Sequence, residues 1–200
     1  MAVCCFVSDR VDAKALQKLK EGGTRLVVLR ATGFNNVNLD AAESLGITVM
    51  RVSNYSPNAV AEFAVGMVLT MNRKIHRAYQ RVREENFRLD ALLGFDLNGK
   101  TVGVVGTGGI GSLFAQIMKG FGCNLLGFDK HESRQCIQLG MRYVSLEDRL
   151  SNSDIVSLHT PLTPETHHLI NADTISLLKE NVILVNTSRG ALVDTRGLIP

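Results

Sequence analysis

The stretch Thr101-Val-Gly-Val-Val105 runs directly into Gly106-Thr-Gly-Gly-Ile-Gly111, and it decides the fold of the second half of the chain. The first five residues are an apolar, valine-rich run that predicts a buried strand. The glycines follow the spacing Gly-x-Gly-x-x-Gly, and a helical pattern continues from them to about residue 121. A lone motif of this kind is weak evidence. Here the strand before it and the helix after it predict a loop that binds phosphate groups.

Each glycine of the Gly-x-Gly-x-x-Gly pattern has a physical role. Gly106 permits the tight turn, Gly108 lets a pyrophosphate approach the backbone, and Gly111 lets the helix pack closely on the strand. The exposed N–H groups and the dipole at the helix start favour an anion. The predicted cofactor-binding loop comprises Gly106, Thr107, Gly108, Gly109, Ile110 and Gly111.

The next predicted strand ends in an acidic residue. Asp129 follows Gly111 by 18 positions, close to the ~20 expected of a dinucleotide-binding unit. A carboxylate there accepts hydrogen bonds from the adenosine ribose and repels a 2′-phosphate, so we expect NAD rather than NADP. Lys130, His131 and Arg134 follow closely and weaken this preference. The alternative is a glycine-rich turn with a surface Asp.

Strands and helices alternate on both sides of this unit, which indicates an α/β fold with a parallel, helix-covered sheet. Asp12 can cap a helix that runs to about residue 21, and residues 39–45 form another short helix. A glycine-containing loop at 93–100 marks a boundary between two predicted domains, 1–97 and 98–200. The predicted strands are 2–7, 25–30, 47–52, 101–105, 124–128, 141–144, 155–158 and 182–185.

A long helix is predicted from about residue 59 to 87, with Asn58 as its cap. Its first half is apolar nearly all round, so we expect it to be buried between layers. Its second half carries a local excess of arginine and lysine. That excess is either a solvated face paired with Glu84 and Glu85 or a surface that attracts anions.

Composition excludes several classes of protein. With 45% hydrophobic and 20% charged residues in 200, the chain is ordinary globular protein, and its net charge of +3 does not indicate a nucleic-acid partner. No apolar run approaches about 18 residues, and the start lacks a basic segment, so neither a membrane span nor a signal peptide is expected. The four cysteines fit neither a zinc site nor a redox pair. We therefore expect no metal, and free thiols in the cytoplasm.

Two further segments in the second half carry a family resemblance. They are Ser153-Asp-Ile-Val-Ser-Leu-His-Thr-Pro-Leu-Thr-Pro-Glu-Thr166 and Asn181-Val-Ile-Leu-Val-Asn-Thr-Ser-Arg-Gly-Ala-Leu-Val-Asp194. Together with the glycine loop, and in this order, they resemble the signatures of the D-isomer-specific 2-hydroxyacid dehydrogenases. The resemblance implies a Rossmann-type NAD-binding domain at 98–200, incomplete at its C-terminus.

Segments of the first half resemble the D-lactate dehydrogenase branch of that family. These segments are Gly33-Phe-Asn-Asn-Val37, Asn54-Tyr-Ser-Pro-Asn-Ala-Val-Ala-Glu62 and Asn72-Arg-Lys-Ile-His-Arg-Ala-Tyr79. The resemblance implies that residues 1–97 are part of a flavodoxin-like substrate domain with an inter-domain helix. Members commonly pair through the cofactor domain, so a homodimer is a further expectation.

The resemblance also implies a substrate site. Arg189 lies just beyond the predicted strand 182–185, where ligands of open α/β sheets bind, and a guanidinium there can hold a carboxylate through two hydrogen bonds. By resemblance it is the catalytic and substrate-binding arginine; the alternative is a surface Arg. Backbone N–H groups of Thr32 and Gly33 would bind the substrate carboxylate. Tyr55 would point its hydroxyl into the cleft, or be a buried structural residue.

The same resemblance implies more cofactor contacts at the ends of the predicted strands. We interpret His159 as a pocket residue, because the acid/base His of the family comes from elsewhere in the chain. The implied cofactor-binding residues beyond the glycine loop and Asp129 are His159, Thr160, Pro161, Thr166, Thr187 and Ser188.

Two functional hypotheses follow from the resemblance. In the first, the sequence is part of an NAD-dependent oxidoreductase acting on a D-2-hydroxy acid, with D-lactate and pyruvate as the first candidates. The His and Glu that move the proton in this family lie beyond the Ser188-Arg-Gly190 motif, and we expect these 200 residues to lack them, as well as an N-terminal part of the substrate domain. In the second, the chain is naturally short, and is a non-catalytic NAD-binding or interaction protein.

Overall fold

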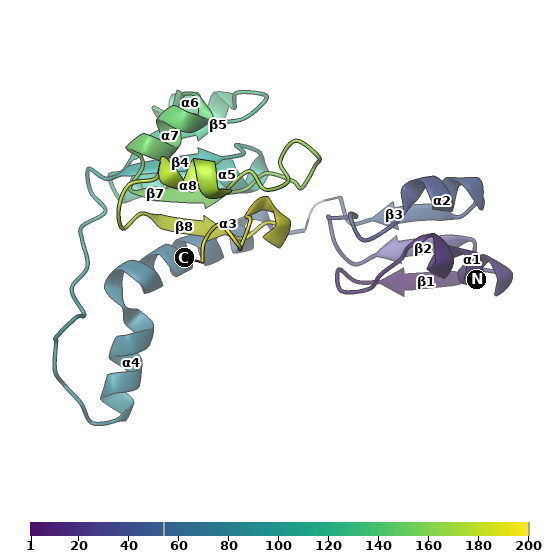
Figure 1. The fold of residues 1–200 in the computed structure, drawn as a ribbon, viewed down its shortest axis with the longest axis horizontal. Coiled ribbons are helices and arrows are strands. Elements are labelled where there is room, and N and C mark those ends of the chain that lie inside the picture. The colour runs from purple at the N-terminus through teal and green to yellow at the C-terminus, as the bar shows by residue number, and fades with distance from the viewer. Residues whose placement is uncertain (54, 200) are drawn as a thin grey trace. The chain divides into compact units, whose positions relative to one another are not determined.

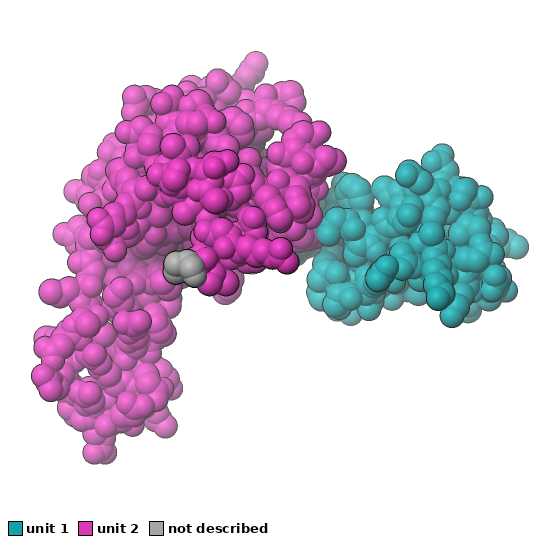
Figure 2. Space-filling view, in the orientation of Figure 1, with its two compact units in different colours: residues 1–56 teal, residues 57–200 magenta. Residues whose placement is uncertain are grey.

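The chain forms two units, and the computed structural model describes residues 1–53 and 55–199. Unit 1 is Met1–Ser56 and unit 2 is Pro57–Pro200, coloured teal and magenta in Figure 2. Asn54, the first residue of one of the segments with a family resemblance, lies outside the described residues. The division by contacts falls before the long helix, which packs in unit 2. The predicted domains 1–97 and 98–200 stay a prediction.

Unit 1 is a small parallel α/β layer. Within its described residues the strand order is β1-β2-β3, with Ala2 opposite Leu26 and Leu26 opposite Thr48. The Asp12 cap is confirmed, because its carboxylate accepts the backbone N–H of Ala15 at 2.9 Å. The elements are β1 (Ala2–Cys5), α1 (Ala13–Glu21), β2 (Leu26–Leu29), α2 (Leu39–Ser44) and β3 (Thr48–Arg51).

Unit 2 is built on a parallel sheet whose order, in the part of the chain that the structure describes, is β6-β5-β4-β7-β8 (Figure 1). The order reverses direction at β4, and such a switch point is where open α/β sheets bind ligands. The predicted α/β class is therefore confirmed. The strands are β4 (Thr101–Val105), β5 (Asn124–Phe128), β6 (Arg142–Tyr143), β7 (Ile155–Leu158) and β8 (Ile183–Asn186).

Helices cover both faces of this sheet. One apolar core lies between the sheet and helices α3 and α5, with Phe114 and Val104 fully buried in it. A second core on the other face holds Leu150, Val156 and Leu192. The helices of this unit are α3 (Pro57–Arg73), α4 (Ile75–Arg83), α5 (Gly109–Gly120), α6 (Arg134–Gln138), α7 (Leu146–Asn152) and α8 (Ala172–Ser176), with a 3-10 turn at Gly190–Leu192.

The single helix predicted over 59–87 is wrong, because the chain breaks between α3 and α4. Lys74 has a left-handed backbone with φ of 54°. Just before it, the buried Asn72 donates to the Phe95 carbonyl at 2.8 Å and accepts the Phe95 N–H at 2.9 Å. The helix ends where Asn72 binds the segment that returns from α4. The helix also begins at Pro57, so Asn58 lies inside it and is not the cap.

The expectation that the apolar half of this helix is buried between layers holds on one side of the helix only. One stripe, which includes Ala61, Ala64 and Val68, packs into the core. On another side Phe63 is 65% exposed and Met71 is 53% exposed. Beyond it, α4 contributes no buried residue and extends away from the sheet (Figure 1). Among the described residues, no helix has both the length and the apolar character needed to cross a membrane.

Candidate functional site

The glycine loop occupies the carboxyl end of β4, at the switch point of the sheet. Gly106 has φ of +88°, and a Cβ there would lie 2.8 Å from the backbone of His159 and Thr160. A Cβ on Gly111 would lie 1.9 Å from the Gly106 carbonyl oxygen. Both positions therefore exclude any side chain. The loop is pressed against the end of β7 on one side and against the start of α5 on the other.

Gly108 is different, because its surroundings are open. A Cβ on it would meet no atom within 4 Å. It is the N-cap of α5, whose first N–H groups have no intrahelical partner, and no side chain among the described residues caps them. An open backbone in front of uncapped N–H groups and a helix dipole fits a pyrophosphate. The geometry of the loop is therefore suited to bind the pyrophosphate of a dinucleotide.

Asp129 follows β5 and its carboxylate lies against the loop. Its Oδ2 accepts the Thr107 N–H at 2.6 Å and lies 3.3 Å from the Thr107 hydroxyl, which donates to it. Its Oδ1 accepts the His131 N–H at 3.2 Å. A hollow of about 360 Å³ adjoins this carboxylate. It is lined by Phe128, Asp129, Glu132, Tyr143, Val144 and Ser145.

Polar side chains that the sequence did not mark support the loop from behind. Ser112 donates to the Thr107 carbonyl at 2.7 Å, and the Tyr143 hydroxyl donates to Thr107 Oγ1 at 2.8 Å. The backbone N–H of Ser133 in turn donates to the Tyr143 hydroxyl at 2.8 Å. No motif in the sequence points to Tyr143. Its role depends on β6 lying beside β5, which only the fold reveals.

His159 ends β7 behind the glycine loop. Its ring packs against Phe114 with centroids 5.0 Å apart, and its Nε2 lies 2.9 Å from the Ser157 hydroxyl. Its Nδ1 is buried and has no hydrogen-bond partner among the described residues. Burial lowers the pKa of His159 to about 4, so the ring is neutral at pH 7. Such a ring is poorly suited to carry a proton, in line with its interpretation as a pocket residue.

The loop after β7 is held by its own hydrogen bonds. Thr166 donates to the Pro161 carbonyl at 2.7 Å and accepts the Thr163 N–H at 2.7 Å. The backbone N of Thr160 lies 2.8 Å from where a Cβ on Gly106 would be. The geometry therefore gives Thr166 a structural task. The cofactor contacts predicted for Thr160, Pro161 and Thr166 stay predictions.

The end of β8 lies beside the end of β7. The Ser188 hydroxyl donates to the Leu158 carbonyl at 3.1 Å. Thr187 Oγ1 is buried and lacks a hydrogen-bond partner in residues 1–53 and 55–199. Arg189 is half-buried, and its guanidinium donates to the Ser188 carbonyl at 3.4 Å. The three residues that follow β8 thus lie on the same edge of the sheet as the glycine loop.

The predicted substrate-binding residues of unit 1 follow β2 and β3. Thr32 and Gly33 are half-buried, and the Arg51 guanidinium donates to the Thr32 carbonyl. Tyr55 is 67% exposed, which removes the alternative of a buried structural tyrosine within this unit. These residues belong to unit 1 and Arg189 to unit 2, so their assembly into one substrate site stays a prediction.

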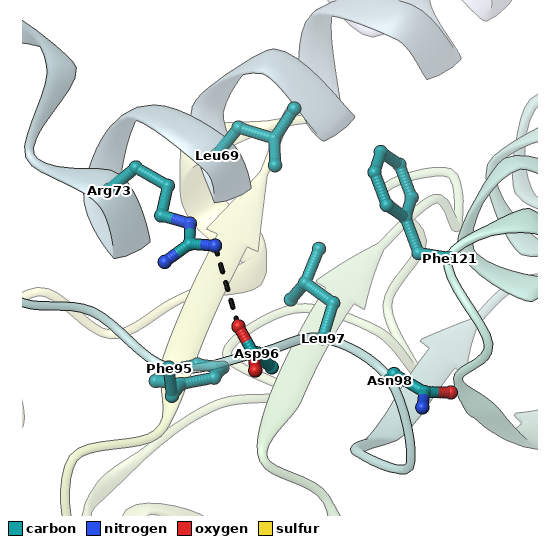
Figure 3. A pocket seen from close by; sticks show the side chains of 7 residues that line it. All are labelled: Leu69, Arg73, Phe95, Asp96, Leu97, Asn98 and Phe121. Atoms are coloured by element: carbon teal, nitrogen blue, oxygen red, sulfur yellow. Dashed lines mark hydrogen bonds and ion pairs between the residues drawn. The ribbon is translucent and has the colours of Figure 1, made fainter.

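Another hollow, of about 250 Å³, lies at the amino-terminal edge of the sheet in unit 2 (Figure 3). An exposed ion pair crosses it, with 3.4 Å between Arg73 Nη2 and Asp96 Oδ1. It is lined by Leu69, Arg73, Phe95, Asp96, Leu97, Asn98 and Phe121, none of which is a predicted site residue. Across the described ranges 1–53 and 55–199, no group of three or more His, Cys, Asp or Glu is arranged to hold a metal ion.

Known proteins share both the sequence and the fold. The chain is 52% identical over 198 residues to the D-lactate dehydrogenase of Escherichia coli, covering 99% of this chain and 60% of that protein. The apo-structure of D-lactate dehydrogenase from Escherichia coli superposes with a TM-score of 0.92 at 52% identity, covering 99% of this chain and 63% of that one. D-lactate dehydrogenase from Aquifex aeolicus, complexed with NAD and lactic acid, gives 0.91 at 39% identity, covering 98% and 59%.

The chain spans about 60% of the length of the curated relatives it matches. The family profile described as "D-isomer specific 2-hydroxyacid dehydrogenase, NAD binding domain" matches residues 65–200. That range contains the glycine loop, Asp129 and Arg189, and it is more than half of the chain. The protein therefore belongs to the D-isomer specific 2-hydroxyacid dehydrogenase family of NAD-binding oxidoreductases.

Proposed function

We propose that the protein serves in the NAD-dependent interconversion of a D-2-hydroxy acid and its 2-keto acid, with D-lactate and pyruvate as the first substrates to test. The observation that carries this proposal is the open backbone at Gly108 beside the Asp129 carboxylate. Relatives support the choice of substrate, since the Aquifex aeolicus enzyme was crystallised with NAD and lactic acid.

In this proposal each residue at the edge of the sheet has one task. The N-terminus of α5 and Gly108 receive the pyrophosphate, and Asp129 accepts the adenosine ribose hydroxyls. Arg189 holds the substrate carboxylate through two parallel hydrogen bonds, which orients C2. Bound NAD supplies the site that accepts or returns the hydride. Thr187, with its unpaired buried hydroxyl, and Ser188 line the same edge.

The assignment of Asp129 is tested by replacing it with alanine. Asp129→Ala loses charge-assisted hydrogen bonds to the ribose, so we expect NADH affinity to fall about tenfold. NADPH affinity should rise, because the negative charge facing the 2′-phosphate is gone. Both affinities are measured by calorimetry, since the chain has no tryptophan to report binding.

Asp96→Ala is the matched control, because it removes the same charge at the opposite edge of the sheet, where Asp96 is exposed. It should leave both affinities as they are. A cofactor preference that Asp129→Ala does not change would contradict the ribose assignment.

The partner that we propose is a second copy of the chain, packed on the apolar face of α3. Phe63, Met67 and Met71 follow at four-residue spacing on one side of this helix and are 65%, 37% and 53% exposed. The segment after α4 also exposes Phe87 and Leu93, at 74% and 89%. An exposed apolar helix face such as that of α3 is typical of a protein–protein interface.

Sedimentation should therefore give twice the chain mass of 21.8 kDa at micromolar concentration. Met71→Lys should shift the protein toward the monomer, because it would bury an unpaired charge in the interface. Met50→Lys, an equally exposed site on β3 of unit 1, is the control and should leave the mass unchanged. A wild-type monomer at tens of micromolar would refute this proposal.

A further inference from the structure

Tyr143 stands at the start of a directed chain of hydrogen bonds that ends at the Asp129 carboxylate. The Ser133 N–H donates to the Tyr143 hydroxyl at 2.8 Å, and that hydroxyl lies 2.8 Å from Thr107 Oγ1. Thr107 Oγ1 lies 3.3 Å from Asp129 Oδ2. The glycine loop, the segment between β5 and α6, and β6 thus meet in one polar cluster.

The donor and the acceptor in each of these hydrogen bonds follow from the number of hydrogens that each group can donate. A hydroxyl has one hydrogen to donate. An ionised carboxylate only accepts, so Thr107 must be the donor to Asp129. The Thr107 oxygen therefore accepts from Tyr143, whose own oxygen accepts the Ser133 N–H. Hydrogen bonds in such a series polarise and strengthen one another.

The surroundings hold the tyrosine ring in place. Its Cε1 lies 3.1 Å from where a Cβ on Gly127 would be, so the ring is seated directly on β5, two residues before Asp129. Thr107 is only 4% exposed, which shields the middle of the chain from competing water. Partial burial raises the pKa of Tyr143, so the hydroxyl stays protonated and able to donate.

The loop carbonyl is held as well, which leaves the Thr107 side chain little freedom. Ser112 donates to the Thr107 carbonyl at 2.7 Å, and the buried Cys136 thiol lies 3.3 Å from the Ser112 hydroxyl. Because the Thr107 backbone is fixed in this way, its hydroxyl can change position only by rotation about χ1. The donor that decides this rotation is Tyr143.

We propose that Tyr143 is a positioning residue for Asp129 and so a determinant of the choice between NAD and NADP. Because Tyr143 donates to Thr107 Oγ1, the Thr107 hydroxyl directs its own hydrogen to Asp129 Oδ2. That oxygen is then held by two donors of the glycine loop, and Oδ1 keeps free acceptor capacity for the ribose diol. This inference rests on the proposed binding of NAD at the glycine loop.

The test compares NADH and NADPH affinities of Tyr143→Phe by calorimetry on the whole protein. Loss of one hydrogen bond that holds the carboxylate should weaken NADH about fivefold. NADPH affinity should stay the same or rise, so the dissociation constant for NADPH divided by that for NADH falls. Thr107→Val should lower the ratio to a similar degree, and the double variant should lower it no further. Thr107→Ser keeps the hydroxyl and should retain the wild-type ratio.

Tyr79→Phe is the matched control, because Tyr79 is exposed on α4 and carries the same hydroxyl. A Tyr143→Phe variant that has a lower melting temperature but an unchanged NADH/NADPH ratio would show a merely structural role and overturn the inference. Additive effects of Tyr143→Phe and Thr107→Val would also overturn it. Wild-type protein that binds no NADH would overturn the proposed function itself, and the inference with it.

Discussion

In the native protein at its full natural length, replacing Arg189 by lysine is expected to remove most of the reduction of 2-keto acid while NADH affinity stays at its wild-type value. A lysine keeps the positive charge but is a point donor, and it cannot form the two parallel bonds of a guanidinium with a carboxylate. Losing one charge-assisted hydrogen bond and the fixed orientation of C2 should lower kcat/KM about 100-fold. The measurements are steady-state kinetics with pyruvate and NADH, and calorimetry with NADH alone.

Arg196→Lys is the control, because Arg196 is an exposed residue of the same C-terminal segment. It should behave as the wild type in both measurements. If Arg189→Lys loses NADH binding instead, Arg189 contacts the cofactor and not the substrate. If the native protein at its full natural length binds NADH but reduces no 2-keto acid, the second hypothesis holds, that of a non-catalytic NAD-binding protein.

Replacing Arg149 by methionine is expected to stabilise unit 2 by about 2 kcal/mol. Arg149 lies on α7 with none of its side chain exposed, and none of its three side-chain nitrogens has a hydrogen-bond partner among the described residues. Its guanidinium lies 4.9 Å from the centroid of the Phe128 ring. This cation–π contact offsets part of the free-energy cost of burying the charge.

The pKa of Arg149 gives the size of this effect. Burial lowers it from 12.5 to about 10. The guanidinium is still protonated at pH 7, where such a depression corresponds to a loss of about 3 kcal/mol in folding free energy. Methionine removes the charge and keeps a flexible apolar side chain, while the cation–π contact with Phe128 is lost at a cost of about 1 kcal/mol.

The free energy of unfolding is measured in urea for the wild type and Arg149→Met. Arg142→Met is the control, because Arg142 is exposed on β6 and should change stability little. A destabilised Arg149→Met variant would show that the guanidinium contributes more through its packing than it loses through burial.

Much of the fold could be predicted because it depends on local patterns of apolar, glycine and capping residues. The strands at 101–105, 124–128 and 155–158 are confirmed to the residue, since each is a short apolar run closed by a glycine or polar residue. The Asp12 cap needs only one side chain and its own helix. The break at Lys74 could not be predicted, because it depends on Asn72 binding a segment more than twenty residues away.

The candidate site divides in a similar way. The sequence predicted both the glycine loop and Asp129 as cofactor-binding residues; the two are in direct contact, and their binding of NAD stays a prediction. It gave no indication of Tyr143, because the residue that supports Thr107 depends on which strand lies beside β5. The roles of Thr32, Gly33, Tyr55 and Arg189 stay predictions. The expected cytoplasmic location does as well, although all four cysteines are free.

The close fit between Gly106 and the end of β7 has a consequence for how the protein acquires its binding site. The backbone of His159 and Thr160 forms the wall against which the glycine loop turns, and those residues come more than fifty positions later in the chain. The loop cannot take its final form until β7 has docked beside β4, and contacts of this sequence separation form late. Nucleotide binding is therefore expected only after β7 has paired with β4. During refolding, it should appear after helical content has already been regained.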